Sequence, residues 1–264
     1  MRASGAVSED LAGLRHQIAG LEGRARYQEI APAVQFAVPA LDAVLGGGLE
    51  PGAVHEVAPA APLHAGAATG FAFALAALAD RTRPGQTIHI ATGFGTAETG
   101  APYGLGLSHY GTAMARVLLV QVPRPIDVLW AMEEALGCRG VAAVIAMLPS
   151  DGAIADLTAT RRLALAARER ASFGLILRQR TTAQPSAAAT RWEVAAAPSR
   201  ADAFGGLGPA RFALDLTKNR RGRCGRFVLE WIHHERAFAD AALSGRVVAA
   251  PVDRPARPPL RRAG

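Results

Sequence analysis

The chain has 264 residues and half of them are hydrophobic, so it can bury a large core, which excludes a wholly disordered protein. The formal net charge of +7 favours contact with polyanions, although Lys218 is the only lysine and an arginine-rich composition also reflects coding bias. No apolar run approaches the roughly 20 residues of a membrane-spanning helix, and two isolated cysteines, Cys138 and Cys224, build no disulfide framework. We therefore expect a cytoplasmic protein without membrane contact.

The two ends of the chain differ in composition from its middle. Residues 1–35 contain a predicted amphipathic helix, Ser8 to Gly23, followed by a proline-punctuated linker. The apolar stripe of this helix covers either the protein's own core or a neighbouring molecule, which leaves self-association open. Residues 244–264 are rich in arginine and proline and are predicted to be a disordered tail, so the folded core is expected over 36–243.

Between these ends, short apolar segments alternate with helical ones. Continuous apolar strands of this kind indicate a parallel sheet covered on both faces. Later segments alternate polar and apolar residues, which suits antiparallel strands. The sequence thus predicts an α/β fold, a mostly parallel sheet flanked by helices with antiparallel C-terminal strands. Predicted strands are 52–57, 86–92, 116–122, 141–148, 173–178, 190–198, 211–216 and 225–234, and predicted helices are 70–80, 103–107, 125–136 and 157–170.

The helix over 125–136 starts with a proline and ends at Gly137. Ile126, Leu129, Trp130 and Leu136 fall on one predicted face, so Trp130 is interpreted as a core aromatic.

The stretch from Glu56 to Leu78 has the outline of a phosphate-binding loop, a strand followed by a Gly-rich and Ala-rich turn and a helix. Residues Gly66, Ala67, Ala68 and Thr69 occupy the expected loop, but a functional loop needs a lysine and a metal-binding hydroxyl there. The acid expected after the strand 141–148 is also displaced, to Asp151 beyond a proline. We therefore expect no hydrolytic activity and no cofactor, and the seven histidines form no metal-binding set.

The segment "LDAVLGGGLEPGAVHEV" resembles the opening of the ATPase core of RecA-type recombinases. An ordered set of further segments resembles the ImuA family of bacterial SOS mutagenesis proteins, over about Leu41 to Trp231. This resemblance implies a degenerate RecA-like core over 36–243 in a non-catalytic accessory protein. It also implies work with an ImuB-type polymerase-like protein, with RecA and indirectly with an error-prone replicative-type polymerase. The segments are "APYGLGL", "RPIDVLWAMEEAL", "DLTATRRLALAA", "TRWEVAAAPS" and "LDLTKNRRGRCGRFVLEW".

The resemblance also suggests contact residues. Lys218, Asn219 and Arg220 match a step that reaches across subunit interfaces in RecA-like filaments, which implies a partner or inter-subunit contact; a solvated turn is the alternative. Six arginines are candidates for weak, salt-sensitive DNA contact, against the alternative of an ordinary charged surface. They are Arg161, Arg162, Arg178, Arg180, Arg221 and Arg223.

Two other functions stay open from the sequence. One is a slow ATPase of DNA repair that uses an atypical loop, with Thr69 in place of the usual hydroxyl. The other is a cell-division inhibitor, because SulA-type checkpoint proteins resemble the same core. The length of the chain and its "TKNRRG" and "LEW" segments favour the ImuA family over the shorter SulA type.

Overall fold

The computed structural model describes residues 32–149, 154–199, 201 and 205–241. The predicted N-terminal helix, the predicted C-terminal tail and Asp151 therefore lie outside the described residues.

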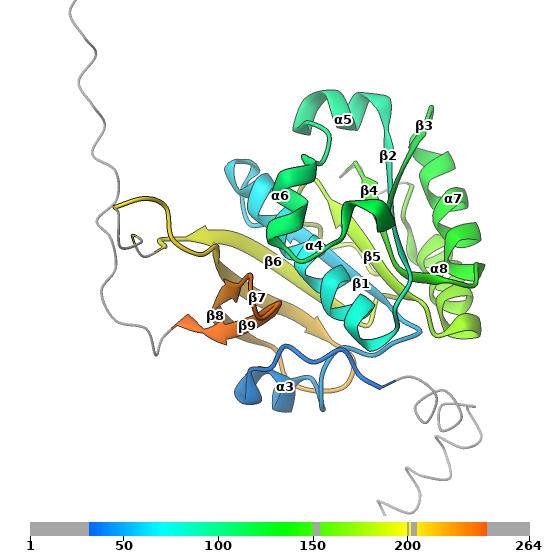
Figure 1. Ribbon diagram of the computed structural model, residues 1–264. Helices are drawn as coiled ribbons and strands as arrows, with labels where there is room; N and C mark the ends of the chain where they lie inside the picture. The colour runs from blue at the N-terminus through cyan, green and yellow to red at the C-terminus, as the bar shows by residue number, and fades with distance from the viewer. Residues whose placement is uncertain (1–31, 150–153, 200, 202–204, 242–264) are drawn as a thin grey trace, which may run out of the picture.

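A mixed sheet runs through the described part of the chain, and its nine strands follow the order β3-β2-β4-β5-β1-β6-β7-β8-β9 (Figure 1). Strands β1 to β6 pair in parallel, whereas β6 to β9 pair antiparallel. The predicted fold class is confirmed. The strands are β1 (Val54–Pro59), β2 (Gln86–Thr92), β3 (Val117–Val122), β4 (Val141–Leu148), β5 (Phe173–Arg178), β6 (Thr190–Ala197), β7 (Arg211–Asn219), β8 (Gly225–Ile232) and β9 (Ala237–Asp240).

Helices cover both faces of the parallel strands. Alternate residues of β4 show this directly, because Ile145 packs in the cluster around α4 while Val144 packs in the cluster around α7 and α8. The helices are α3 (Pro39–Val44), α4 (Ala65–Thr82), α5 (Gly93–Thr99), α6 (Gly104–His109), α7 (Pro125–Gly137) and α8 (Leu157–Arg170), with short 3-10 turns η1 (Pro62–His64) and η2 (Met114–Arg116).

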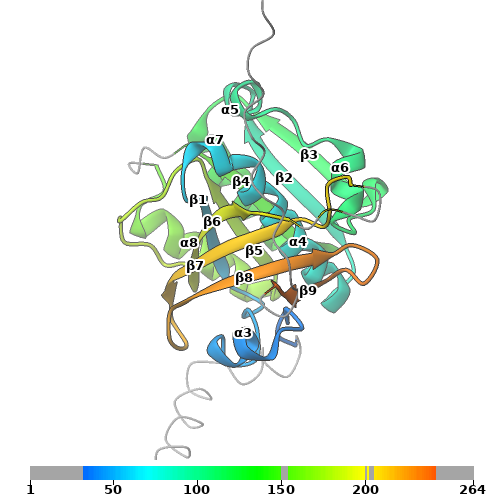
Figure 2. The same cartoon turned by 90° about the vertical axis from the view of Figure 1, so that its left-hand side faces the viewer.

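An aromatic cluster fills the core between α4 and the antiparallel strands. Trp192 on β6 is fully buried, and its Nε1–H donates to Thr190 Oγ1 at 2.8 Å. Phe36 is also fully buried, with its ring centroid 5.8 Å from that of Trp192 and 5.4 Å from that of Phe238. The segment before α3 thus wraps onto the sheet and closes the core at the lower end of the view in Figure 2.

The core assignment of Trp130 is wrong, because this side chain is 65% exposed on α7. Ile126, one turn earlier, is also exposed, whereas Leu129 and Leu136 are buried as predicted. A 13-residue helix against a sheet buries only one stripe. Val128, Leu129, Met132 and Leu136 fill that stripe, and Trp130 falls outside it.

The expectation that no apolar segment approaches membrane-spanning length is wrong, because Pro62–Thr82 is long and apolar enough by length and composition alone. In the fold most of it is buried, because α4 packs against β1, β4, β5 and β6. Its alanines allow the helix to lie close to the strands. The apolar character of this segment is that of a core helix.

Candidate functional site

The residues expected in a phosphate loop lie in a helix. Gly66, Ala67, Ala68 and Thr69 belong to the first turns of α4, which begins at Ala65 directly after η1. The Thr69 hydroxyl donates to the Ala65 carbonyl at 3.0 Å, within the same helix. The loop prediction is therefore wrong for these residues, because alanine favours the helix and the segment has no long glycine-rich turn.

A cavity of about 490 Å³ lies beside the start of α4. Tyr110 packs against the helix there, since a Cβ placed on Gly70 would collide with the Tyr110 hydroxyl. Burial lowers the pKa of His89, another lining residue, to about 4, so this imidazole is neutral near pH 7. None of the described residues that line the cavity is an arginine, lysine, aspartate or glutamate. A triphosphate would find no cationic side chain in this space.

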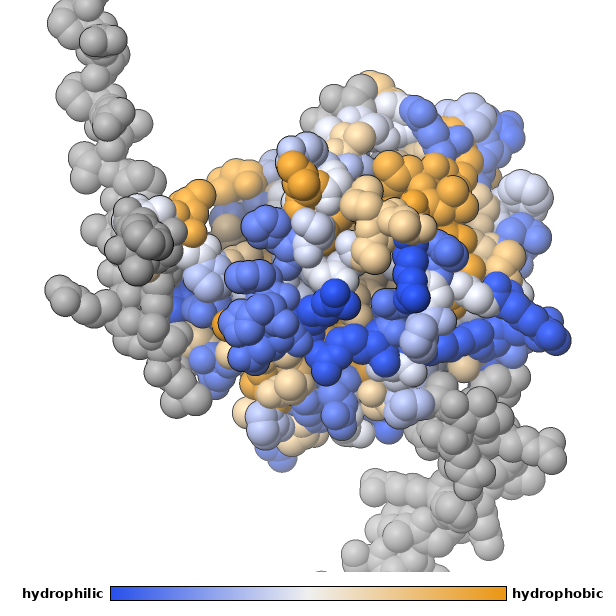
Figure 3. Space-filling model, in the orientation of Figure 1, coloured by the Kyte–Doolittle hydropathy of each residue, from blue (hydrophilic) through white to orange (hydrophobic). Residues whose placement is uncertain are grey.

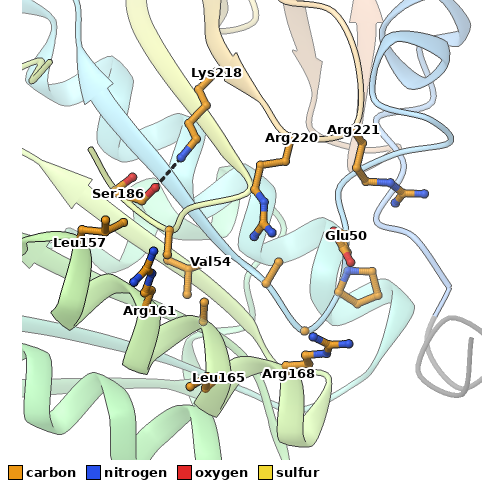
Figure 4. Close-up of a pocket in the computed structure, with 15 residues that line it drawn as sticks. Glu50, Val54, Leu157, Arg161, Leu165, Arg168, Ser186, Lys218, Arg220 and Arg221 are labelled. Atoms are coloured by element: carbon orange, nitrogen blue, oxygen red, sulfur yellow. Dashed lines mark hydrogen bonds between the residues drawn. The ribbon is translucent and has the colours of Figure 1, made fainter. Parts of the chain in front are cut away.

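A larger pocket of about 640 Å³ lies on the opposite face of the sheet, between α8 and the end of β7 (Figure 4). Its walls come from the turn that precedes β1, from α8, from the loop that precedes β6, and from the turn after β7. In the part of the chain that the structure describes, five cationic side chains and one acid line it, together with apolar residues. The charged residues are Arg161, Arg168, Lys218, Arg220, Arg221 and Glu50. We call this site the basic pocket.

The cations of the basic pocket come from two separate parts of the chain. Arg161 on α8 and Arg220 after β7 lie on opposite sides of the hollow (Figure 4). Among the described residues, Arg161, Arg220 and Arg221 form no ion pair with an acid. Apolar side chains, including Val54 and Leu165, lie between the charged groups. The pocket therefore combines excess positive charge with an apolar surface, which suits an anionic ligand that also carries apolar groups.

Lys218 is held at the inner side of the pocket. Its Nζ donates to the Ser186 carbonyl at 2.6 Å. Burial lowers the pKa of Lys218, and the nearby positive charges of Arg191 and Arg220 lower it further, while the negative charge of Glu56 acts in the opposite direction. An anion bound here would relieve the repulsion among these cations.

A buried carboxylate supports this wall of the pocket. Glu56 in β1 accepts from Arg178 Nη2 at 2.7 Å and from Arg191 Nε at 2.6 Å. Burial alone would raise the pKa of Glu56, but the attraction and hydrogen bonds of Arg178 and Arg191 outweigh it, so the pKa is lowered. The carboxylate is therefore charged at neutral pH and binds two guanidinium groups.

Arg191 links Glu56 to the loop that lines the basic pocket. Besides its pair with Glu56, its guanidinium donates to the Thr182 and Gln184 carbonyls at 2.9 and 2.8 Å and to Ser186 Oγ at 3.2 Å. The Ser186 carbonyl in turn accepts a hydrogen bond from the Lys218 ammonium. The loop before β6 is thus fixed between a buried ion pair and the lysine of the pocket.

The Asn219 side chain makes hydrogen bonds to backbone groups of the chain itself. Its Nδ2 donates to the Val44 and Arg223 carbonyls, both at 3.0 Å, and its Oδ1 accepts from the Arg221 backbone N–H at 3.0 Å. This residue shapes the β7–β8 turn and ties it to α3. Of the three residues predicted to contact a partner, Lys218 and Arg220 are therefore the ones that line the basic pocket.

The six arginines predicted to contact DNA do not form one surface. Arg161 and Arg221 line the basic pocket, whereas Arg162 pairs with Glu133 at 2.7 Å on the other side of α8. Arg180 is exposed after β5, and Arg223 is exposed on the β7–β8 turn.

Arg178 is not available to DNA, which corrects that prediction, because it is 2% exposed and its charge is paired with Glu56. Its position at the end of a central strand places the side chain under the loops. Sequence reasoning also missed Arg168. The signal was present, since Arg168 follows Arg161 by two helical turns and shares its face of α8.

Comparison with known proteins gives a family relationship over most of the chain. Protein ImuA of Caulobacter vibrioides (strain NA1000 / CB15N) is 34% identical over 214 residues, which covers 75% of this chain and 83% of the relative. Protein ImuA of Caulobacter vibrioides (strain ATCC 19089 / CIP 103742 / CB 15) matches with the same identity and coverage. The chain matches no protein-family model.

Proposed function

The chain belongs to the ImuA family, and from this premise we propose that it is a non-catalytic adaptor in SOS-induced, error-prone translesion DNA synthesis. In this role it binds an ImuB-type polymerase-like protein and RecA in the cytoplasm, and through them an error-prone polymerase. The observation that carries the proposal is the basic pocket, where Lys218 and Arg220 meet Arg161, Arg168 and Arg221 around one hollow.

The charge of the pocket supports a protein contact. Among its described lining residues five cations face one acid, Glu50, so the pocket favours an acidic surface on a partner. Its accessible apolar lining, which includes Leu157 and Leu165, offers places for aliphatic anchors of such a partner. None of the described residues that line the pocket is aromatic, so among them the bases of single-stranded DNA would find no stacking partner.

The cavity beside α4 supports the absence of nucleotide chemistry. Phosphoryl transfer depends on cations placed around the phosphates. The only lysine of the chain lies in the basic pocket, and the described residues around the α4 cavity are uncharged near pH 7. The adaptor therefore works through its surfaces.

The test is binding of the purified chain to immobilised ImuB-type protein and, separately, to RecA. Replacing Lys218 and Arg220 with Ala should weaken binding to at least one of them by about a hundredfold or more, because each lost charge-assisted hydrogen bond costs roughly 1.5–3 kcal/mol. The matched control replaces Arg180 and Arg223, two exposed cations outside the pocket, and changes the net charge equally.

Control binding within a factor of about three of the unaltered chain is expected. Equal losses in both double variants would mean that only the overall charge matters, which contradicts a role for the pocket. Binding to single-stranded DNA that falls with the pocket variant while both proteins still bind would assign the site to nucleic acid instead.

A further inference from the structure

The sheet has one edge that is built unlike the other. The edge strand β3, Val117–Val122, reads VLLVQV and contains no charged residue and no proline. Soluble proteins usually protect an edge strand with charges, prolines or short length, because its unpaired backbone groups otherwise attract another strand. Within the strand this edge carries none of these protections, and the nearest charges and proline flank it at Arg116, Pro123 and Arg124.

The opposite edge, β9, follows the usual rule. It spans only Ala237–Asp240 and contains an acid within the strand itself. Both edges belong to the same sheet, so the contrast is internal to this fold. The lack of protection on β3 is therefore a specific feature of that edge.

Large apolar side chains are exposed around β3. Leu118 is 53% exposed and Leu119 is 47% exposed, on opposite faces of the strand. Leu118 pairs with Ile88 on the α7 face, and Leu119 pairs with His89, whose ring stacks on Phe73 of α4. Figure 3 shows hydrophobic side chains gathered between α6 and β3. The exposed apolar residues on α5, at the start of α6 and on η2 are Phe94, Tyr103, Leu105 and Met114.

The area of this surface approaches that of a protein interface. The six side chains are between 44% and 75% exposed. At roughly 150–250 Å² for each of the two aromatic side chains and about 100 Å² for each leucine or methionine, they present on the order of 500 Å² before the strand backbone is counted. A standard protein–protein interface buries about 800 Å² on each partner.

A partner strand for β3 should be uncharged and carry apolar residues on both faces. The remaining segments of the chain do not have this pattern. The described chain ends at Ala241 beside β9, at the far edge of the sheet from β3 (Figure 1). The sequence 242–264 contains repeated prolines and arginines, and the apolar residues of 8–23 are spaced for a helix. A strand with the required chemistry is instead found in β3 itself.

We propose that two copies of this chain associate by antiparallel pairing of their β3 strands, which joins the two sheets edge to edge. A two-fold axis perpendicular to the sheet through Leu119 keeps every side chain on its own face. Leu119 then lies opposite its counterpart, and Leu118 lies opposite Val120 of the other copy. The pairing satisfies the free backbone groups of both edges and covers the apolar side chains beside them. This self-association is independent of the partner contacts of the basic pocket, which lies across the sheet.

The test is sedimentation velocity of the full chain over a concentration series. The unaltered protein should form a dimer that dissociates on dilution. Leu119→Lys should raise the dissociation constant about a hundredfold, because the interface carries the substitution twice, each at a cost of about tenfold, with the two ammonium groups face to face. Leu118→Lys, on the other face of the strand, should act in the same direction and serves if the first variant does not fold.

The matched control is Val228→Lys, which places the same charge on the exposed side chain of another strand, β8. It should leave the dimer unchanged. A chain with Leu119→Cys and with Cys138 and Cys224 replaced by Ser should form a disulfide-linked dimer under mild oxidation, since directly opposed strand residues lie within disulfide distance. A monomer at every concentration, or a dimer that survives Leu119→Lys and Leu118→Lys, would overturn the proposal.

Discussion

Glu56→Gln is the substitution whose effect can be worked out most fully from this structure. The Glu56 side chain is 1% exposed and binds Arg178 and Arg191, which are themselves 2% and 14% exposed. Glutamine keeps the shape but removes the negative charge, so two guanidinium groups are left without a counter-ion. Two nitrogens of Arg178, Nε and Nη1, already have no partner among the described residues.

The expected loss of stability is large. Removing one partner of a buried ion pair costs about 3–5 kcal/mol, because the remaining charge stays buried without compensation. For a protein of this size that corresponds to a fall of roughly 6–20 °C in melting temperature. The matched control is Asp215→Asn, the same chemical change in the exposed pair with Arg226, where the cost should be below about 1 kcal/mol.

The assay is urea unfolding followed by circular dichroism, repeated as a function of pH. Because the folded pKa of Glu56 is lowered, its contribution is fully present above the unfolded value of about 4.3 and is lost as pH falls through the folded pKa. The difference between the unaltered protein and Glu56→Gln should therefore shrink in acid. Equal costs for Glu56→Gln and Asp215→Asn near pH 7 would refute the reasoning.

Three further outcomes are expected. Burial lowers the pKa of His55 and His89 to about 4, below the 6.5 of the unfolded chain. Between these two values the unfolded chain binds more protons than the folded one, so the urea midpoint should fall as pH drops from about 6.5 to about 4. A constant midpoint would contradict this. Trp192→Ala should cost about 3–5 kcal/mol in unfolding free energy, whereas Trp130→Ala should change it by less than about 0.5 kcal/mol, and similar values would show that the burial assignments are wrong. Calorimetric titration with ATP and Mg²⁺ should give no micromolar binding, because the cavity beside α4 has no described cation; micromolar affinity with turnover would revive an ATPase.

The sequence predicts eight of the nine described strands, because most are continuous apolar runs, such as β4, that are typical of buried strands, but it misses the short strand β9. It does not predict the edge position of β3, whose apolar sequence resembles that of a central strand. Strand order depends on crossovers that no local pattern encodes. The exposure of Leu118 and Leu119 is therefore visible only in the fold.

The sequence predicts several residues of the basic pocket but not that they lie together. Lys218, Arg220 and Arg161 were each singled out, but for two different roles. They meet because β1 lies between β5 and β6, which brings α8 and the end of β7 to the two sides of the turn before β1. The burial of Arg178 could not be foreseen either, since its partner Glu56 comes from a distant part of the chain.

The central claim is that the basic pocket, and no nucleotide site, is the working part of this protein. The most direct measurement is damage-induced mutagenesis in cells that lack the endogenous protein and carry either the unaltered chain, the variant with Lys218→Ala and Arg220→Ala, or the control with Arg180→Ala and Arg223→Ala. At matched protein levels, mutagenesis should be restored by the unaltered chain and by the control but lost in the pocket variant. Full mutagenesis in the pocket variant would contradict the claim.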